Sequence, residues 1–112
     1  MRIGNDIEEV DRFVNFKRDS KFILNNFSKY EIDYCFNKTK PQIHLCGIFC
    51  AKESIIKVLN LKDFSFLDIE IKHDFLGRPI VIVFGEDVSK YVDVSISHSN
   101  NYAIATALNF KK

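Results

Sequence analysis

Long hydrophobic runs, paired cysteines and an excess of either charge are all missing from this 112-residue sequence. The longest apolar stretches are far shorter than a membrane-spanning helix, and the first residues lack the basic-then-apolar pattern of a secretion signal. The three cysteines, Cys35, Cys46 and Cys50, form no paired framework, which is typical of a reducing compartment. A zinc site at Cys46, Cys50 and His44 would lack a second ligand pair at zinc-finger spacing. We therefore expect a soluble, cytoplasmic protein that does not associate with membranes.

The formal net charge is only +1, so the whole molecule does not steer an acidic partner from a distance. Positive charge is nevertheless concentrated at Arg12, Lys17, Arg18 and Lys21, where Asp19 alone opposes it. Such a segment can meet an acidic partner locally. Nucleic acid is disfavoured as that partner, because the charge is confined to one short stretch.

Hydrophobic residues make up 46% of the chain, which favours a folded globule over a disordered one. The length is enough for one core and too small for two, so we expect a single domain over residues 1–112. Its core should be rich in aromatic rings, because the chain contains 11 Phe and 4 Tyr.

The first residues predict a short strand over residues 1–7, followed by a short helix that buries Ile7, Val10 and Val14. Asp6 lies at the junction of the two elements. An aspartate immediately before a helix is commonly an N-cap that accepts a backbone N–H bond. On position alone, Asp6 is therefore more easily explained as a cap than as a catalytic residue.

Further helix signals follow. A short helix is expected over residues 18–26, and the capping box from Ser28 to Glu31 begins another that runs to about residue 36. Pro41 suits the first turn of a long helix that extends to Leu59. This helix should pack one apolar stripe on the core, formed by Leu45, Phe49, Ile56 and Leu59.

The second half of the chain changes from helical to alternating periodicity. Alternation predicts antiparallel strands over about residues 66–72, 80–84, 92–98 and 102–108. A turn at residues 77–79 and a hairpin at Asn100-Asn101, with positive φ angles, should connect them, and residues 85–90 are a short connection with room for one helical turn. The expected class is α+β, with N-terminal helices and one long helix packed on an antiparallel β-sheet.

Four residues form a constellation suited to phosphoryl chemistry: Asp6, Glu53, Lys57 and His98. Glu53 and Lys57 lie one helical turn apart, and as an isolated surface pair they would stabilise the helix by only about 0.2–0.5 kcal/mol. Mg²⁺ prefers oxygen ligands and is typically held by one or two carboxylates together with substrate phosphates and water. Asp6 and Glu53 can supply that pair if the long helix packs beside the first strand. Lysine and histidine nearby would neutralise phosphate charge or move a proton.

Two segments also match a known pattern. Residues 4–12, Gly-Asn-Asp-Ile-Glu-Glu-Val-Asp-Arg, are similar to a G-x-D-x-x-x-x-x-R opening, and residues 49–57 are similar to an F-x-A-K-E-x-x-x-K helix. Further matches occur in the same order at residues 28–35, 68–71, 77–79 and 94–99. With this ordered set over nearly the whole chain, the sequence resembles the holo-acyl-carrier-protein synthases, which are small bacterial 4′-phosphopantetheinyl transferases.

The resemblance implies an enzyme that transfers 4′-phosphopantetheine from coenzyme A to a serine of apo acyl carrier protein. The reaction would depend on Mg²⁺, release adenosine 3′,5′-bisphosphate, and serve a carrier protein of fatty-acid biosynthesis or secondary metabolism. By this resemblance Asp6 and Glu53 are the metal ligands. Lys57 protonates or neutralises the departing phosphate, and His98 and Ser99 contact the coenzyme A phosphates.

The same resemblance implies a homotrimer with its active sites at the subunit interfaces. The half that contains Asp6 and Glu53 and the half that contains His98 would then come from neighbouring chains. Arg12 and the basic residues Lys17, Arg18 and Lys21 would dock the acidic helix of the carrier protein.

Two positions depart from the family pattern. Many relatives have an arginine before the motif phenylalanine, where this chain has Ile48. The loop of residues 60–63 contains no glycine, although this loop is often glycine-rich in the family. Lys62 or Arg78 could replace the lost phosphate contact. These departures leave an alternative, in which the chain is a non-catalytic module that binds a carrier protein or a nucleotide.

Overall fold

The computed structural model describes residues 1–111. In chain order its elements are β1 (Arg2–Glu9), the 3₁₀ helix η1 (Val10–Phe13), α1 (Lys21–Asn26), α2 (Lys29–Phe36), α3 (Pro41–Leu59), the 3₁₀ helix η2 (Phe66–Asp68), β2 (Ile69–His73), β3 (Pro79–Val83), β4 (Glu86–Asp87), β5 (Val92–His98) and β6 (Tyr102–Asn109). This order confirms the predicted α+β class. Within these residues, no helix combines the length and the apolar character that a membrane span requires.

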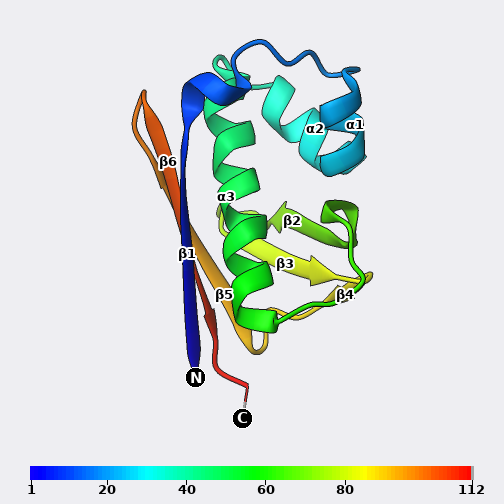
Figure 1. Cartoon of the computed structure of the whole chain (residues 1–112), viewed down its shortest axis with the longest axis vertical. Helices are drawn as coiled ribbons and strands as arrows, with labels where there is room; N and C mark the ends of the chain where they lie inside the picture. The colour runs from blue at the N-terminus through cyan, green and yellow to red at the C-terminus, as the bar shows by residue number, and fades with distance from the viewer. Residues whose placement is uncertain (112) are drawn as a thin grey trace.

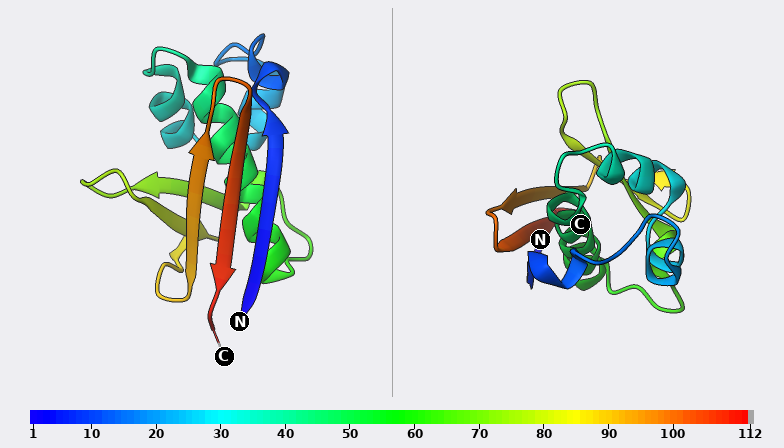
Figure 2. Two further views of the ribbon diagram at one scale, coloured as in Figure 1. Left: turned by 90° about the vertical axis from the view of Figure 1, so that its left-hand side faces the viewer. Right: turned by 90° about the horizontal axis from the view of Figure 1, so that it is seen from above.

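The strands form two antiparallel sheets where the sequence predicted a single meander. One sheet has the order β1-β6-β5 and the other has the order β2-β3-β4. The long helix α3 lies along one face of the first sheet and also contacts β2 (Figure 1). Helices α1 and α2 cover one end of α3, while the opposite face of the first sheet is covered by no element of residues 1–111 (Figure 2).

Small residues allow α3 to lie close to the sheet. Ala103, Ala105 and Ala107 of β6 are all buried, so the central strand presents only methyl groups to the helix. The predicted start of α3 is confirmed, because Pro41 occupies its first turn. The helix ends at Asn60, which takes the left-handed conformation with a φ of 52° that commonly terminates helices.

Asp6 does not cap a helix, although its position alone favoured that explanation. Strand β1 continues to Glu9 and pairs with β6 along its whole length, with Asp6 opposite Ala105. In a strand, alternate residues point to opposite faces, so Asp6 lies on the face next to α3 and Ile7 on the uncovered face. The helix that follows buries Val10 and Phe13, whereas Ile7 and Val14, predicted to be buried, are exposed.

Other local predictions had mixed outcomes. The capping box is confirmed, because the Ser28 hydroxyl accepts the Glu31 N–H and the Glu31 side chain accepts the Ser28 N–H. Helix α1 begins only at Lys21, three residues later than predicted. Leu67, expected in a strand, lies exposed in η2, and the expected helical turn near residue 86 is the short strand β4.

The hairpin between β5 and β6 is present but is closed in a different way from the one predicted. Positive φ angles occur at other non-glycine residues among those described, and neither Asn100 nor Asn101 has one. The Ser99 hydroxyl instead accepts the backbone N–H groups of Asn101 and Tyr102, at 3.2 and 3.1 Å. A side-chain acceptor of this kind stabilises a turn without a left-handed residue.

Candidate functional site

Asp6 is a buried acid with an unpaired oxygen. Its side chain is only 16% exposed, and its Oδ2 atom is buried without a hydrogen-bond partner among the described residues. Burial, followed by the negative charges of Glu8 and Glu53, raises the pKa of Asp6 to about 6. An isolated carboxylate in such a place is costly, and a bound cation would remove that cost.

The approach of β1 to α3 brings Asp6 and Glu53 together. A Cβ atom on Gly4 would lie 2.8 Å from the Ser54 carbonyl oxygen and 3.0 Å from the Lys57 Cβ atom, so the strand and the helix touch at this point. Glu53 is half-buried on α3, next to Ser54. The packing of the long helix beside the first strand, on which the predicted carboxylate pair depends, is therefore present.

Lys57 completes this cluster one turn further along α3. Its ammonium group donates a 2.7 Å hydrogen bond to the Asn5 carbonyl oxygen and lies 3.9 Å from the Asp6 Oδ1 atom. The side chain is 52% exposed, so a bound anion can reach it. Asp6, Glu53 and the accessible Lys57 thus lie near one another where β1 contacts α3, and we call these three residues the acidic cluster.

The donor set fits Mg²⁺. Asp6 and Glu53 offer carboxylate oxygens, which this hard cation prefers, and the unpaired Asp6 oxygen is available. No cluster of three or more His, Cys, Asp or Glu side chains placed to hold a metal occurs in residues 1–111. A carboxylate pair leaves coordination positions for substrate phosphate and water. The thiols of Cys46 and Cys50, considered above as zinc ligands, lie 3.6 and 3.4 Å from the carbonyl oxygens of Glu8 and Ala103.

Glu8 is a neighbour of this cluster that the sequence reasoning missed. It follows Asp6 by two residues on the same strand, so it lies on the same face of β1. Its carboxylate accepts a 2.8 Å hydrogen bond from Arg12, whose guanidinium also lies 4.8 Å from the centroid of the Phe49 ring. Arg12 is therefore held beside the acids. Alternation would have placed Glu8 here if the first strand had been predicted to reach residue 9.

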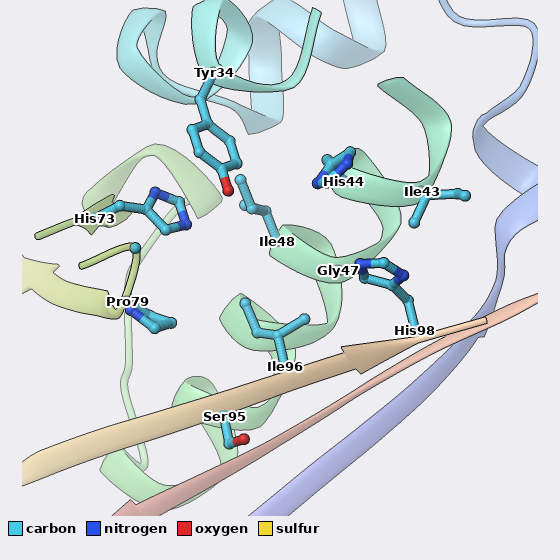
Figure 3. A pocket seen from close by; sticks show the side chains of 11 residues that line it. Tyr34, Ile43, His44, Gly47, Ile48, His73, Pro79, Ser95, Ile96 and His98 are labelled. Carbon is cyan, nitrogen blue, oxygen red and sulfur yellow. The ribbon is translucent and has the colours of Figure 1, made fainter. Parts of the chain in front are cut away.

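His98 belongs to a separate cavity of about 240 Å³ on the other side of α3. Its ring meets His44 of α3 edge to face, with centroids 5.5 Å apart, and Tyr34 stacks on His73 at 4.0 Å (Figure 3). Burial, and then the charge of His98, lowers the pKa of His44; burial also lowers the pKa of His73. No sequence pattern joined Tyr34, His44 and His73, because they come from three different elements.

Ile48, which replaces the family arginine, also lines this cavity. The side chain is 2% exposed, so the wall at this position is apolar and offers no charge to a phosphate. The cavity and the acidic cluster are distinct, because Asp6 lies on β1 and His98 on β5, which are opposite edges of the sheet. Within one chain the two predicted halves of the site are therefore separated by β6.

The remaining predicted cofactor contacts lie on turns. The Ser99 hydroxyl closes the β5–β6 hairpin, and Arg78 is 73% exposed with its Nε atom 3.4 Å from Asp74. Lys62 is exposed in a loop whose flanking residues, Asn60 and Asp63, both have left-handed φ angles, of 52° and 51°. The glycine-free loop therefore takes the conformations that glycine usually provides.

The basic segment is divided by its ion pairs. Arg18 pairs with Asp33 of α2, and Arg12 pairs with Glu8 as described above. Lys17 and Lys21 are exposed, and neither forms an ion pair with another residue in the part of the chain that the structure describes. These two lysines are therefore the basic side chains most accessible to an acidic partner.

Comparison with known proteins gives one family. A model of the 4′-phosphopantetheinyl transferase superfamily matches residues 2–107. The chain is 44% identical over 117 residues to a holo-[acyl-carrier-protein] synthase of Clostridium acetobutylicum, covering 95% of this chain and 94% of that protein. It is 40% identical over 116 residues to a holo-[acyl-carrier-protein] synthase of a Thermoanaerobacter species, covering 95% and 84%.

Solved structures agree with this result. The Helicobacter pylori holo-[acyl-carrier-protein] synthase, crystallised in complex with coenzyme A, has a TM-score of 0.80 and 31% identity, covering 96% of this chain and 99% of that one. The Bacillus anthracis synthase, also in complex with coenzyme A, has the same TM-score and identity, covering 98% and 96%. The chain therefore belongs to the holo-acyl-carrier-protein synthases of the 4′-phosphopantetheinyl transferase superfamily.

Proposed function

We propose that this enzyme transfers 4′-phosphopantetheine from coenzyme A to a serine of apo acyl carrier protein, in a Mg²⁺-dependent reaction that releases adenosine 3′,5′-bisphosphate. The observation that carries the proposal is the buried Asp6 oxygen without a partner, beside Glu53, in a chain of this family. A new bond forms between the serine oxygen and the phosphorus attached to pantetheine, and the bond from that phosphorus to the adenosine-side phosphate breaks.

Asp6 and Glu53 would hold Mg²⁺ between β1 and α3. When bound, the cation supplies positive charge that neutralises the diphosphate of coenzyme A. The accessible ammonium group of Lys57 belongs to the same acidic cluster and would neutralise or protonate the departing phosphate. Because the attacking serine is an ordinary hydroxyl, most of the catalysis would come from placing the reactants and stabilising charge.

The cavity around His98 would receive the nucleotide part of coenzyme A. It combines aromatic rings with imidazole donors, which suits a purine and its phosphates. The structures of the Helicobacter pylori and Bacillus anthracis synthases hold coenzyme A, which supports coenzyme A as the substrate here. Binding energy from the nucleotide would position the reacting phosphorus, which lies at a distance from it.

A homotrimer would explain how the two separated halves form one site. The uncovered face of the first sheet carries exposed apolar side chains, among them Ile3, Ile7, Tyr102 and Ile104. Ile7 and Ile104 are direct partners across β1 and β6, whereas the polar pair Asn5 and Thr106 separates them from Ile3. Exposed apolar side chains of this kind favour an association surface, and association through it would bring the His98 half of one chain to the Asp6 half of its neighbour.

The carrier protein would dock on the basic segment near α1. Lys17 and Lys21 are free to pair with its acidic helix, while Arg12 and Arg18 are already paired within the chain. Because Arg12 lies beside Glu8, part of this surface would lie next to the acidic cluster. A serine presented there would approach the carboxylate pair.

A mass measurement tests the proposal. The protein is mixed with apo carrier protein, coenzyme A and Mg²⁺, and the carrier is examined for the mass increment of phosphopantetheine. We expect the increment with the natural protein and none with Asp6→Ala or Glu53→Ala, while both variants keep their circular dichroism spectra. No increment from the natural protein at saturating substrates would favour the non-catalytic binding module instead.

A further inference from the structure

The most deeply buried charges of the protein lie outside the proposed reaction. Lys52 and Glu31 are both completely buried, and the Lys52 ammonium nitrogen lies 2.7 Å from the Glu31 Oε1 atom. Lys52 directly precedes Glu53 on α3. Its side chain nevertheless points away from the acidic cluster and into the contact between α2 and α3. A charge pair in such a place needs a structural reason, because removing both charges from water is costly.

The ammonium group of Lys52 joins three separate segments. Besides Glu31, it donates hydrogen bonds to the Asn26 carbonyl oxygen at 2.8 Å and to the Phe66 carbonyl oxygen at 3.0 Å. Asn26 is the last residue of α1, and Phe66 is the first residue of η2. The three donors of the ammonium group are therefore all used, and each one ties α3 to a different part of the chain.

The carboxylate of Glu31 is equally satisfied. Its Oε1 atom accepts the Ser28 N–H at 2.8 Å, and its Oε2 atom accepts the Ile71 N–H at 2.8 Å. Ser28 begins α2, and Ile71 lies in the middle of β2. One ion pair thus joins the end of α1, the beginning of α2, α3, η2 and β2 through directional bonds.

An apolar pair of similar size could fill this space with comparable stability, as substitutions of buried ion pairs in other proteins show. Apolar contacts would let α1 and α2 slide against α3, whereas four directional bonds between segments fix one arrangement. This matters because α1 carries Lys21 and α2 carries Asp33, the ion-pair partner of Arg18. The distance from these groups to Glu53 decides where a docked serine lies.

We propose that the Glu31–Lys52 ion pair is a positioning device that fixes the carrier-docking segment, residues 17–36, at a set place relative to Glu53. The inference rests on the proposed function and adds residues that act through others and do not touch the substrate. Carrier docking and metal binding would then depend on different residues of the molecule. Carrier docking depends on the ion pair, whereas the carboxylate pair Asp6 and Glu53 is built on β1 and α3 and does not.

The test compares Lys52→Met and Glu31→Gln with the natural protein. For both we expect the KM for the carrier protein to rise roughly tenfold or more, because a loosened segment must be ordered again on binding. The affinity for Mg²⁺ alone, measured by calorimetry without carrier or coenzyme A, should stay within about twofold of the natural value. The double variant should be no worse than the more affected single variant, because both changes break one interaction.

Amide hydrogen exchange provides a readout apart from turnover. Exchange should accelerate in residues 21–36 of both variants and stay unchanged in β1 and β6. Val92→Ala is the matched control, since it makes a cavity at a buried residue of β5 and leaves the ion pair intact. It should lower stability without changing the KM for the carrier.

The outcomes separate the possibilities. A normal carrier KM in Glu31→Gln, which retains an oxygen for the Ile71 N–H, would overturn the positioning role even if Lys52→Met does not fold. A rise in carrier KM of the same size in Val92→Ala would also overturn it, since lost stability alone would then be the cause. The absence of transfer by the natural protein would refute the proposed function, while the hydrogen-exchange result would still report on the ion pair.

Discussion

Gly4→Ala tests the close approach of β1 to α3, on which the carboxylate pair depends. The added methyl group would lie 2.8 Å from the Ser54 carbonyl oxygen, 3.0 Å from the Lys57 Cβ atom and 3.1 Å from a Val58 methyl carbon. The first two belong to the rigid part of the helix, so the strand itself must move. Overpacking of this kind costs about 1–3 kcal/mol.

The magnitude follows from two opposing contributions. Alanine gains about 0.5–1 kcal/mol over glycine by restricting the unfolded chain; set against the middle of the overpacking cost, about 2 kcal/mol, this leaves a net loss of roughly 1–1.5 kcal/mol. For a protein of this size, 1 kcal/mol corresponds to about 4 °C in Tm, so the expected decrease is about 4–6 °C. Moving β1 away from α3 should also separate Asp6 from Glu53 and weaken the stabilisation that Mg²⁺ gives.

Thermal unfolding by circular dichroism, at one fixed protein concentration, measures both effects. Gly47→Ala is the matched control. Its methyl group would meet only a methyl carbon of Ile96, at 2.9 Å, and Ile96 lines a cavity with room to adjust. Alanine also favours the helix, so the control should stay within about 1 kcal/mol of the natural protein. A Gly4→Ala variant with an unchanged Tm would refute the close contact inferred here.

Three further predictions follow from the site. Mixing inactive Asp6→Ala with inactive His98→Ala should restore part of the transfer activity if neighbouring chains share a site, and no rescue after confirmed subunit exchange would count against sharing. Lys21→Glu should raise the KM for the carrier protein and leave the KM for coenzyme A unchanged; equal changes in both would contradict a docking role. Asn60→Gly should change unfolding free energy by less than about 1 kcal/mol, because glycine takes the φ of 52° without strain, whereas Asn60→Val should cost roughly 1–3 kcal/mol in a denaturant titration.

Local signals predicted the parts of the fold that local interactions determine. The capping box at Ser28 and Glu31, the first turn of α3 at Pro41 and the alternation of β5 each depend on residues within a few positions of one another. Their hydrogen bonds and apolar faces are decided before any distant segment arrives. The ordered motifs also identified the family, and with it the residues proposed for the site.

Predictions failed where a distant partner decides the structure. Position alone favoured a helix cap at Asp6, because nothing near it in the sequence reveals that residues 2–9 pair with residues 102–109 at the other end of the chain. That pairing extends the strand to Glu9 and exposes Ile7. Leu67 likewise alternates with its neighbours as in a strand, yet it lies in a 3₁₀ helix capped by Ser65.

The sequence by itself determined the α+β class, the long helix and the family, and it supplied the acids, lysine and histidine that we propose for the site. Only the tertiary structure decided that Asp6 faces Glu53, that His98 lies in a different cavity, and that Lys52 is buried against Glu31. The physical reason is the range of the interactions. Helix caps and periodicity are set by neighbours in the chain, whereas burial and the meeting of charges depend on which distant segments pack together.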